Sequence, residues 1–122
     1  MFSNKSILII AVMAIMLFGS VALNAAYYYV HVTSNHSGSG TVWLEDEETG
    51  DRYDEREVTY INGTINVWPP LVAPTGIAVD AHAEGSYNNE YDHDWDDAQP
   101  FGHTYLELDL EPWDPNKTPG TY

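Results

Sequence analysis

An acidic segment, residues 90–97, carries the side chains best suited to bind a cation. Its carboxylates alternate with histidine and aromatic residues, and its four aspartates are Asp92, Asp94, Asp96 and Asp97. Calcium is bound in proteins by several converging oxygen ligands. Like charges so close together also repel each other unless a cation relieves them. In a chain so rich in carboxylates the segment is first of all interpreted as an acidic loop exposed to solvent, and the alternative is a site for calcium or another divalent cation.

The spacing does not fit a calcium loop of the EF-hand type. Counted from Asp92, the position that requires glycine is Asp97, and the position that requires the bidentate glutamate is His103. No helical pattern flanks the segment on either side. Any calcium site here would therefore be of another type.

Four histidines offer ligands for a transition metal: His31, His82, His93 and His103. Imidazole nitrogens bind zinc, copper and nickel, but a site needs at least two or three of them on one ion. His31 and His82 lie at outward-facing positions of expected strands. None of the four forms a close pair at ligand spacing along the chain, so we expect separate surface histidines.

Aromatic residues could form a platform for sugar rings. The chain has nine tyrosines and four tryptophans, namely Trp43, Trp68, Trp95 and Trp113. Trp43 and Trp68 each alternate with aliphatic neighbours, so the two indoles could be exposed together as a carbohydrate-binding surface. The alternative is that most of these rings pack in the core or on strand faces.

Composition argues against catalysis and against nucleic acid as a partner. Nineteen acidic residues make some close carboxylate pairs inevitable, and no serine elbow, HExxH motif or phosphate-binding glycine loop is present. The absence of cysteine removes disulfides and thiolate chemistry. The formal net charge is −15, and Arg52, Arg56 and Lys117 cannot form a basic stripe. We expect a chain that is not an enzyme and binds no nucleic acid.

Three N-x-Ser/Thr triplets are candidate glycosylation sites. Their acceptors are Asn35, Asn62 and Asn116, and all three fall in expected loops, turns or the tail. A glycan at Asn62 would crowd a tight turn. The prediction depends on a location outside the membrane.

The N-terminal segment supplies that location. Lys5 precedes an unbroken apolar run at residues 7–18, and residues 19–26 are mostly small, as in a signal peptide with a peptidase site. As a helix, residues 7–26 would span about 30 Å, which also fits an uncleaved anchor. A third alternative is a pilin-like subunit, although the long amphipathic helical continuation of bacterial pilins is missing. Each alternative places the rest of the chain outside the cytoplasm.

After residue 26 the hydrophobic period changes to two, which is typical of strands. We expect strands at residues 27–33, 41–45, 57–61, 64–68, 77–84 and 103–110. Asn62-Gly63 is expected to close a hairpin between residues 58–61 and 64–68. Residues 85–102 read as a long polar loop.

These elements predict an all-β fold, a small antiparallel immunoglobulin-like β-sandwich preceded by one N-terminal hydrophobic helix. The expected division is residues 1–26 as signal peptide or membrane anchor, 27–111 as an acidic extracytoplasmic domain, and 112–122 as a proline-rich tail.

The function that this division favours is that of an exported or membrane-anchored envelope protein with a structural or interaction domain. Its expected partners are other envelope or surface proteins, because these share the expected extracytoplasmic location. The alternatives are a calcium-binding or carbohydrate-binding module and a pilin-like filament subunit.

Overall fold

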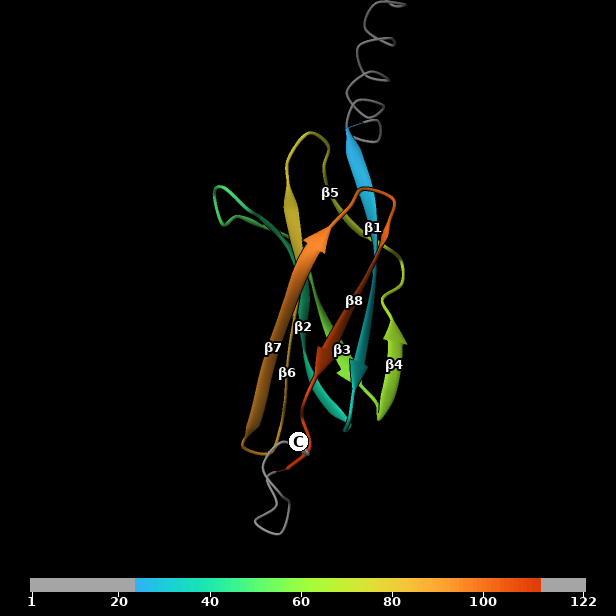
Figure 1. Cartoon of the computed structure of the whole chain (residues 1–122), viewed down its shortest axis with the longest axis vertical. Helices are drawn as coiled ribbons and strands as arrows, with labels where there is room; N and C mark the ends of the chain where they lie inside the picture. The colour runs from blue at the N-terminus through green and yellow to red at the C-terminus, as the bar shows by residue number, and fades with distance from the viewer. Residues whose placement is uncertain (1–23, 113–122) are drawn as a thin grey trace, which may run out of the picture.

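The computed structural model describes residues 24–112, which form eight strands (Figure 1). They are β1 (Ala25–Ser34), β2 (Gly38–Asp46), β3 (Arg52–Tyr60), β4 (Gly63–Asn66), β5 (Leu71–Pro74), β6 (Val79–Tyr87), β7 (Glu90–Ala98) and β8 (His103–Leu108). Within residues 24–112, no helix is long and apolar enough to cross a membrane. The predictions for residues 1–23, which include the hydrophobic helix, and for residues 113–122 concern segments outside the described part.

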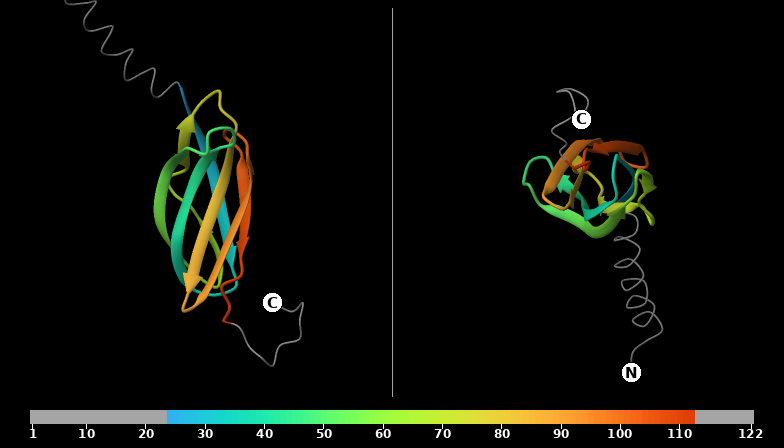
Figure 2. Two further views of the ribbon diagram at one scale, coloured as in Figure 1. Left: turned by 90° about the vertical axis from the view of Figure 1, so that its left-hand side faces the viewer. Right: turned by 90° about the horizontal axis from the view of Figure 1, so that it is seen from below.

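The strands form two sheets, which confirms the all-β prediction. In the first sheet β1 is central: β4 and β5 pair with its two halves, and β8 pairs with it as well. The second sheet has the order β3-β2-β6-β7. Figure 2 shows the strands of both sheets running along the long axis of the domain.

The pairing is antiparallel throughout the two sheets except between β1 and β8, which are parallel. This exception to the expected antiparallel pairing has a topological cause. Because β8 follows β7, which belongs to the other sheet, the chain crosses from one sheet to the other before β8 pairs. No hairpin therefore constrains the direction of β8 relative to β1.

The core is built by the alternating residues that the sequence predicted. Fully buried side chains come from both sheets: Tyr28, Val30 and Val32 of β1, Val42 and Leu44 of β2, Val79, Ala81 and Ala83 of β6, and Leu106 and Leu108 of β8. Leu110 is also buried. Each of these strands presents one apolar face inward, as expected when two sheets pack face to face.

The hairpin prediction at Asn62-Gly63 is wrong. β3 pairs with β2, whereas β4 pairs with β1 in the other sheet, so Asn62-Gly63 links two sheets. Gly63 does adopt a positive φ of 146°, a backbone conformation that favours glycine. The sequence therefore predicted a turn at Asn62-Gly63 correctly. It did not predict that β3 and β4 would pair with different strands, because strand pairing depends on long-range packing.

The loop prediction for residues 85–102 is also wrong. β6 continues to Tyr87, Asn88 turns with a positive φ of 53°, and β7 pairs with β6 along its whole length. β7 is an edge strand, and its residues are almost all polar. Because it lacks an apolar face, it does not show the alternation that revealed the other strands.

The side of the sandwich between β3 and β5 is closed by an ion pair. Arg56 lies 2.8 Å from the carboxylate of Asp54 and donates to the backbone carbonyls of Pro69 and Pro70. Asp54 also accepts a hydrogen bond from the backbone N–H of Val72 at 2.9 Å. The half-buried side chains of Asp54 and Arg56 thus supply hydrogen bonds to backbone groups that a paired strand would supply inside a sheet.

Candidate functional site

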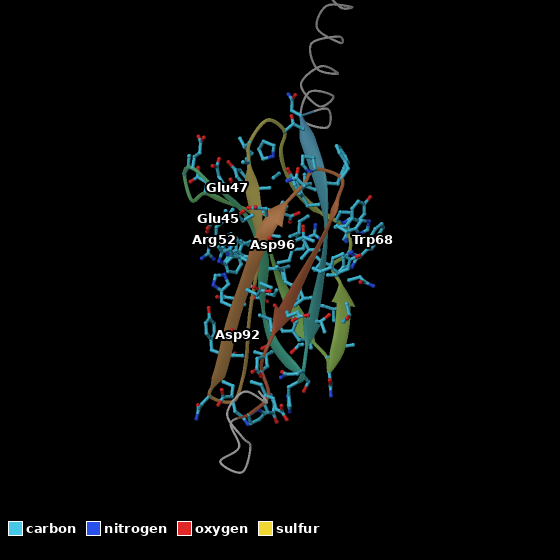
Figure 3. The ribbon with its side chains drawn as sticks, in the orientation of Figure 1. Glu45, Glu47, Arg52, Trp68, Asp92 and Asp96 are labelled. Carbon is cyan, nitrogen blue, oxygen red and sulfur yellow. The ribbon has the colours of Figure 1, made fainter. Side chains whose placement is uncertain are left out.

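Both outer faces of the sandwich carry a row of stacked aromatic and histidine rings. We call the outer face of sheet β3-β2-β6-β7, with Trp43, His82, His93 and Trp95, the acidic face. We call the outer face of β1 and β8, with Tyr29, His31, His103 and Tyr105, the tyrosine face. Figure 3 shows Glu45, Glu47 and Arg52 on one side of the molecule and Trp68 on the opposite side.

On the acidic face, strand register places the rings in one row. Trp43 of β2 lies opposite His82 of β6, which lies opposite Trp95 of β7. The ring centroids of Trp43 and His82 are 5.1 Å apart and those of His82 and Trp95 are 6.1 Å apart. The guanidinium of Arg52 lies 4.0 Å from the centre of the Trp43 ring, a cation–π contact. Trp43 is therefore covered and only 2% exposed.

Two histidines of the acidic face meet through their nitrogens. His82 Nδ1 lies 2.8 Å from His93 Nε2, and the two rings are nearly parallel. On the other side of its ring, His82 Nε2 lies 3.3 Å from a carboxylate oxygen of Glu45. This nitrogen is buried, and it makes no hydrogen bond to Glu45 or to any other described residue. Burial lowers the pKa of His82, with Glu45 opposing this effect and His93 and Arg52 adding to it.

A carboxylate cluster lies beside this row. Glu47, Asp80 and Asp97 bring one oxygen each within 4.8 Å of one another. Burial first, and then the hydrogen bonds and negative charges of Glu47 and Asp97, together raise the pKa of Asp80 to about 7. Such a cluster holds a proton near neutral pH. Sequence reasoning missed it because its members come from three separate segments.

The structure divides the four aspartates that predicted a calcium site. Asp92 accepts a hydrogen bond from the backbone N–H of Asp109, and Asp94 accepts one from the N–H of Glu107, both at 2.8 Å. These bonds join β7 to the free edge of β8. Asp96 accepts a bond from the backbone N–H of Asp97, whose side chain belongs to the cluster with Glu47 and Asp80. The four carboxylates are not brought together as one ligand set.

The tyrosine face repeats the histidine pair in a more open setting. His31 Nε2 lies 2.8 Å from His103 Nδ1, and His31 Nδ1 lies 2.6 Å from the side-chain oxygen of Asn66. Tyr29 stacks on His103 with ring centroids 4.9 Å apart, and Tyr105 stacks on His31 at 4.7 Å. Tyr105 is 68% exposed, so the row faces solvent.

The prediction of separate surface histidines is wrong for all four. His31 pairs with His103 and His82 pairs with His93, each pair joining two strands. The available signal was their outward-facing position in the period-two pattern. What the sequence lacks is the register between strands, which decides whether outward residues become neighbours.

The predicted Trp43 and Trp68 platform does not form. Trp43 is covered by Arg52 on the acidic face, whereas Trp68 follows β4 of the other sheet and is 76% exposed. Exposed aromatic rings lie on both faces: Tyr91 and Trp95 on β7 of the acidic face, and Trp68, Phe101 and Tyr105 near the tyrosine face. Near the tyrosine face, Tyr27 and Phe101 contact each other with centroids 6.0 Å apart.

The glycosylation candidates have different surroundings. The side-chain oxygen of Asn35 accepts hydrogen bonds from the backbone N–H groups of Leu110 and Glu111, and its nitrogen donates to Asp109. Asn62 is exposed in the link between the two sheets. Asn116 lies outside the described residues. A glycan on Asn35 would have to disturb the contacts that hold the end of the domain, whereas one on Asn62 would not.

The arrangement can do two kinds of chemistry: the rings of the tyrosine face can stack on a partner, and the nitrogens and carboxylates of the acidic face can bind a cation. In comparisons with protein-family models, curated proteins and solved structures, no match is found. The geometry of the described residues is therefore the basis for the proposals that follow.

Proposed function

We propose that the chain is a non-enzymatic protein of the cell envelope, secreted or anchored in the cytoplasmic membrane by residues 7–26. Its domain is an immunoglobulin-like β-sandwich with a structural or interaction role in a surface or membrane assembly. The apolar N-terminal run supports the location. The sheet order β3-β2-β6-β7, two hairpins joined through their inner strands, supports the immunoglobulin-like arrangement.

The observation that carries the interaction role is the exposure of aromatic rings around the tyrosine face. Tyr105 is 68% exposed, Phe101 60% and Trp68 76%. Aromatic residues are enriched at the centres of protein interfaces, where they bury a large area at a low entropy cost. In a chain with a formal charge of −15, this region offers contact area that does not depend on charge. We assign it to another envelope or surface protein.

Site-specific photo-crosslinking in the native envelope tests this role. A photoreactive phenylalanine at position 105 is expected to give discrete crosslinked species with a partner protein. The same residue at position 95 is the matched control, because Trp95 is 55% exposed but lies on the acidic face. Equal crosslinking at both positions, or none at position 105, would contradict the assignment.

A carbohydrate-binding module is the second candidate, favoured by the stacking of His31 and Tyr105 in one exposed row. Neutral sugars are not repelled by the negative charge of the chain. A glycan array separates the two candidates: binding of a neutral glycan that Tyr105→Ala abolishes supports the module, whereas crosslinking to protein without glycan binding supports the interaction domain.

The location has a test of its own. N-terminal sequencing and intact mass of the protein from its native envelope distinguish a cleaved signal peptide from a retained anchor and from a leader cut at Lys5. Recovery of the full chain from the cytoplasm would contradict the proposal.

A further inference from the structure

The histidine pair of the acidic face has the geometry of two metal ligands. His82 and His93 lie on the paired strands β6 and β7 as diagonal neighbours, two residues apart in register, because His82 faces Trp95 and His93 faces Glu84. Their nitrogens are 2.8 Å apart. With metal–nitrogen distances of about 2.0–2.1 Å, that separation corresponds to an angle of about 85° at the metal. Square-planar and tetragonal ions have adjacent ligands at about this angle.

We propose that His82 Nδ1 and His93 Nε2 bind one divalent transition-metal ion, with Cu²⁺ and Ni²⁺ preferred over Zn²⁺. Both ions favour imidazole ligands and square-planar or tetragonal geometry, whereas zinc favours tetrahedral angles. His93 is exposed, so water completes the coordination. The site requires no other part of the proposed function.

Glu45 supplies an independent observation in favour of a metal. Ligand histidines commonly donate their other ring N–H to a carboxylate, which fixes the ring and its tautomer. His82 is only 7% exposed, and its Nε2 is buried, lacks a hydrogen bond and lies 3.3 Å from Glu45. With the proton on Nε2, beside the Glu45 carboxylate, the lone pair of Nδ1 faces His93.

The protons can be accounted for in both states. Without metal, His93 Nε2–H donates to His82 Nδ1 across the 2.8 Å separation. When the ion binds, the proton of His93 moves from Nε2 to Nδ1, so that both facing nitrogens offer lone pairs. Each imidazole carries one proton before and after this step, so the step itself releases none.

The surroundings hold the pair in place and attract a cation. Trp43 stacks on both rings, with centroids 5.1 Å from His82 and 5.7 Å from His93. Arg52 covers the other side of Trp43 and is itself 3.8 Å from Glu45. Glu84, opposite His93 in the register, adds negative charge. A pair held by stacking loses little freedom when it binds a metal.

The tyrosine face provides a matched control within the same chain. The nitrogens of His31 and His103 are also 2.8 Å apart, but the outer nitrogen of His31 contacts the amide of Asn66. This pair has the same spacing without a carboxylate behind it. A metal site that depends on Glu45 should therefore distinguish the two pairs.

Metal titration of the untagged full-length protein in detergent micelles tests the proposal. We expect Cu²⁺ and Ni²⁺ to bind with one equivalent at pH 7.5 in calorimetry and to quench tryptophan fluorescence, since Trp43 stacks on both ligands. The EPR spectrum of the Cu²⁺ form should show coupling to two imidazole nitrogens. His93→Asn should weaken binding at least tenfold, and Glu45→Gln about tenfold. His103→Asn should leave the affinity within about twofold.

Other results would overturn the site. No saturable binding to the unmodified chain would leave the pair as an imidazole–imidazole hydrogen bond. Loss of binding in His103→Asn but not in His93→Asn would assign the metal to the tyrosine face, and loss in Asp97→Asn alone would assign it to the carboxylate cluster. Because His93 is exposed, its substitution is compatible with the fold, and an unchanged melting temperature checks this.

Discussion

The acidic face and the tyrosine face carry the same unit in opposite environments. In each, two histidines with nitrogens 2.8 Å apart are stacked between larger aromatic rings. On the acidic face Trp43 is 2% exposed, and a carboxylate lies behind His82. On the tyrosine face Tyr105 is 68% exposed, and an amide lies behind His31. Burial and neighbouring charge, rather than the unit itself, decide what each can bind.

The difference follows from the position of the strands. β2 and β6 are inner strands of a sheet with long neighbours on both sides, so a ring on either strand is flanked and covered. β1 is flanked by β8 and by the four-residue strands β4 and β5, which cover less of its outer face. A short neighbour therefore leaves the rings open to a partner.

The largest expected effect is that of removing the covered indole. Trp43→Ala should lower the free energy of unfolding by about 3–5 kcal/mol, because a buried large side chain leaves a cavity. Tyr105→Ala is the control and should cost less than about 1 kcal/mol, since the ring is 68% exposed. Urea unfolding measures both. Equal losses would show that the two faces do not differ in burial.

The next effect concerns β7, which links the acidic face to the sheet of the tyrosine face. Asp94→Ala should destabilise the domain by about 1–3 kcal/mol, because the backbone N–H of Glu107 loses its acceptor. Asp96→Ala, which removes only a local contact with Asp97, should change stability by less than about 0.5 kcal/mol. Thermal unfolding of the two variants side by side checks the difference, and a reversed order would refute the bridging role.

The carboxylate cluster beside the acidic face should make the stability of the domain depend on pH. The pKa of Asp80 is raised from 3.8 in the unfolded chain to about 7. The folded state therefore favours the protonated carboxyl, and the contribution of Asp80 to the free energy of unfolding is largest below about pH 4. It falls as the pH rises towards 7. Because Asp80 is partly exposed and shares its proton with neighbours, we expect a loss of about 1–2 kcal/mol.

Asp80→Asn removes this dependence and checks it. The variant should be more stable than the unmodified chain at pH 7.5 and no more stable at pH 4, as measured by unfolding curves at both values. Tyr105→Ala on the tyrosine face is a control that should leave the dependence of stability on pH between these two values unchanged. If Asp80→Asn destabilised the domain equally at both pH values, its raised pKa would not govern stability.

The smallest effect is expected from removing the cation that covers Trp43. Arg52→Ala should cost about 0.5–1 kcal/mol, the usual contribution of a solvent-facing cation–π contact. It should also make Trp43 accessible to acrylamide quenching. Arg52→Lys should restore part of both. No change in quenching would mean that the stacked rings, rather than Arg52, protect the indole.

The fold could be predicted where one strand face is apolar. Val30 and Val32, Val79 and Ala81, and Leu106 and Leu108 alternate with outward residues, and each set is buried as expected. This pattern is local, because the side chains of a strand point alternately to the two faces. It identified these strands and the core but not β5 or β7, and it contained no information about which strand lies beside which.

The parts that could not be predicted depend on contacts between distant segments. β7 was missed because its inward side chains are carboxylates such as Asp92 and Asp94, which serve the backbone of β8. The histidine pairs were missed because they arise only from strand register. The same register separated Asp97 from the other aspartates of the predicted calcium site and placed it with Glu47 and Asp80.

The parallel pairing of β1 with β8 bears on when the domain can fold. One edge of β1 is paired by β4 at residues 63–66, whereas the other edge, over residues 29–34, is paired by residues 103–108 of β8. In the proposed export, β1 lies close to the apolar run at residues 7–18 and reaches the far side of the membrane before β8 does. Pairing over so long a separation is slow to form. That edge of β1 therefore stays without its neighbour until residues 103–108 have also been exported.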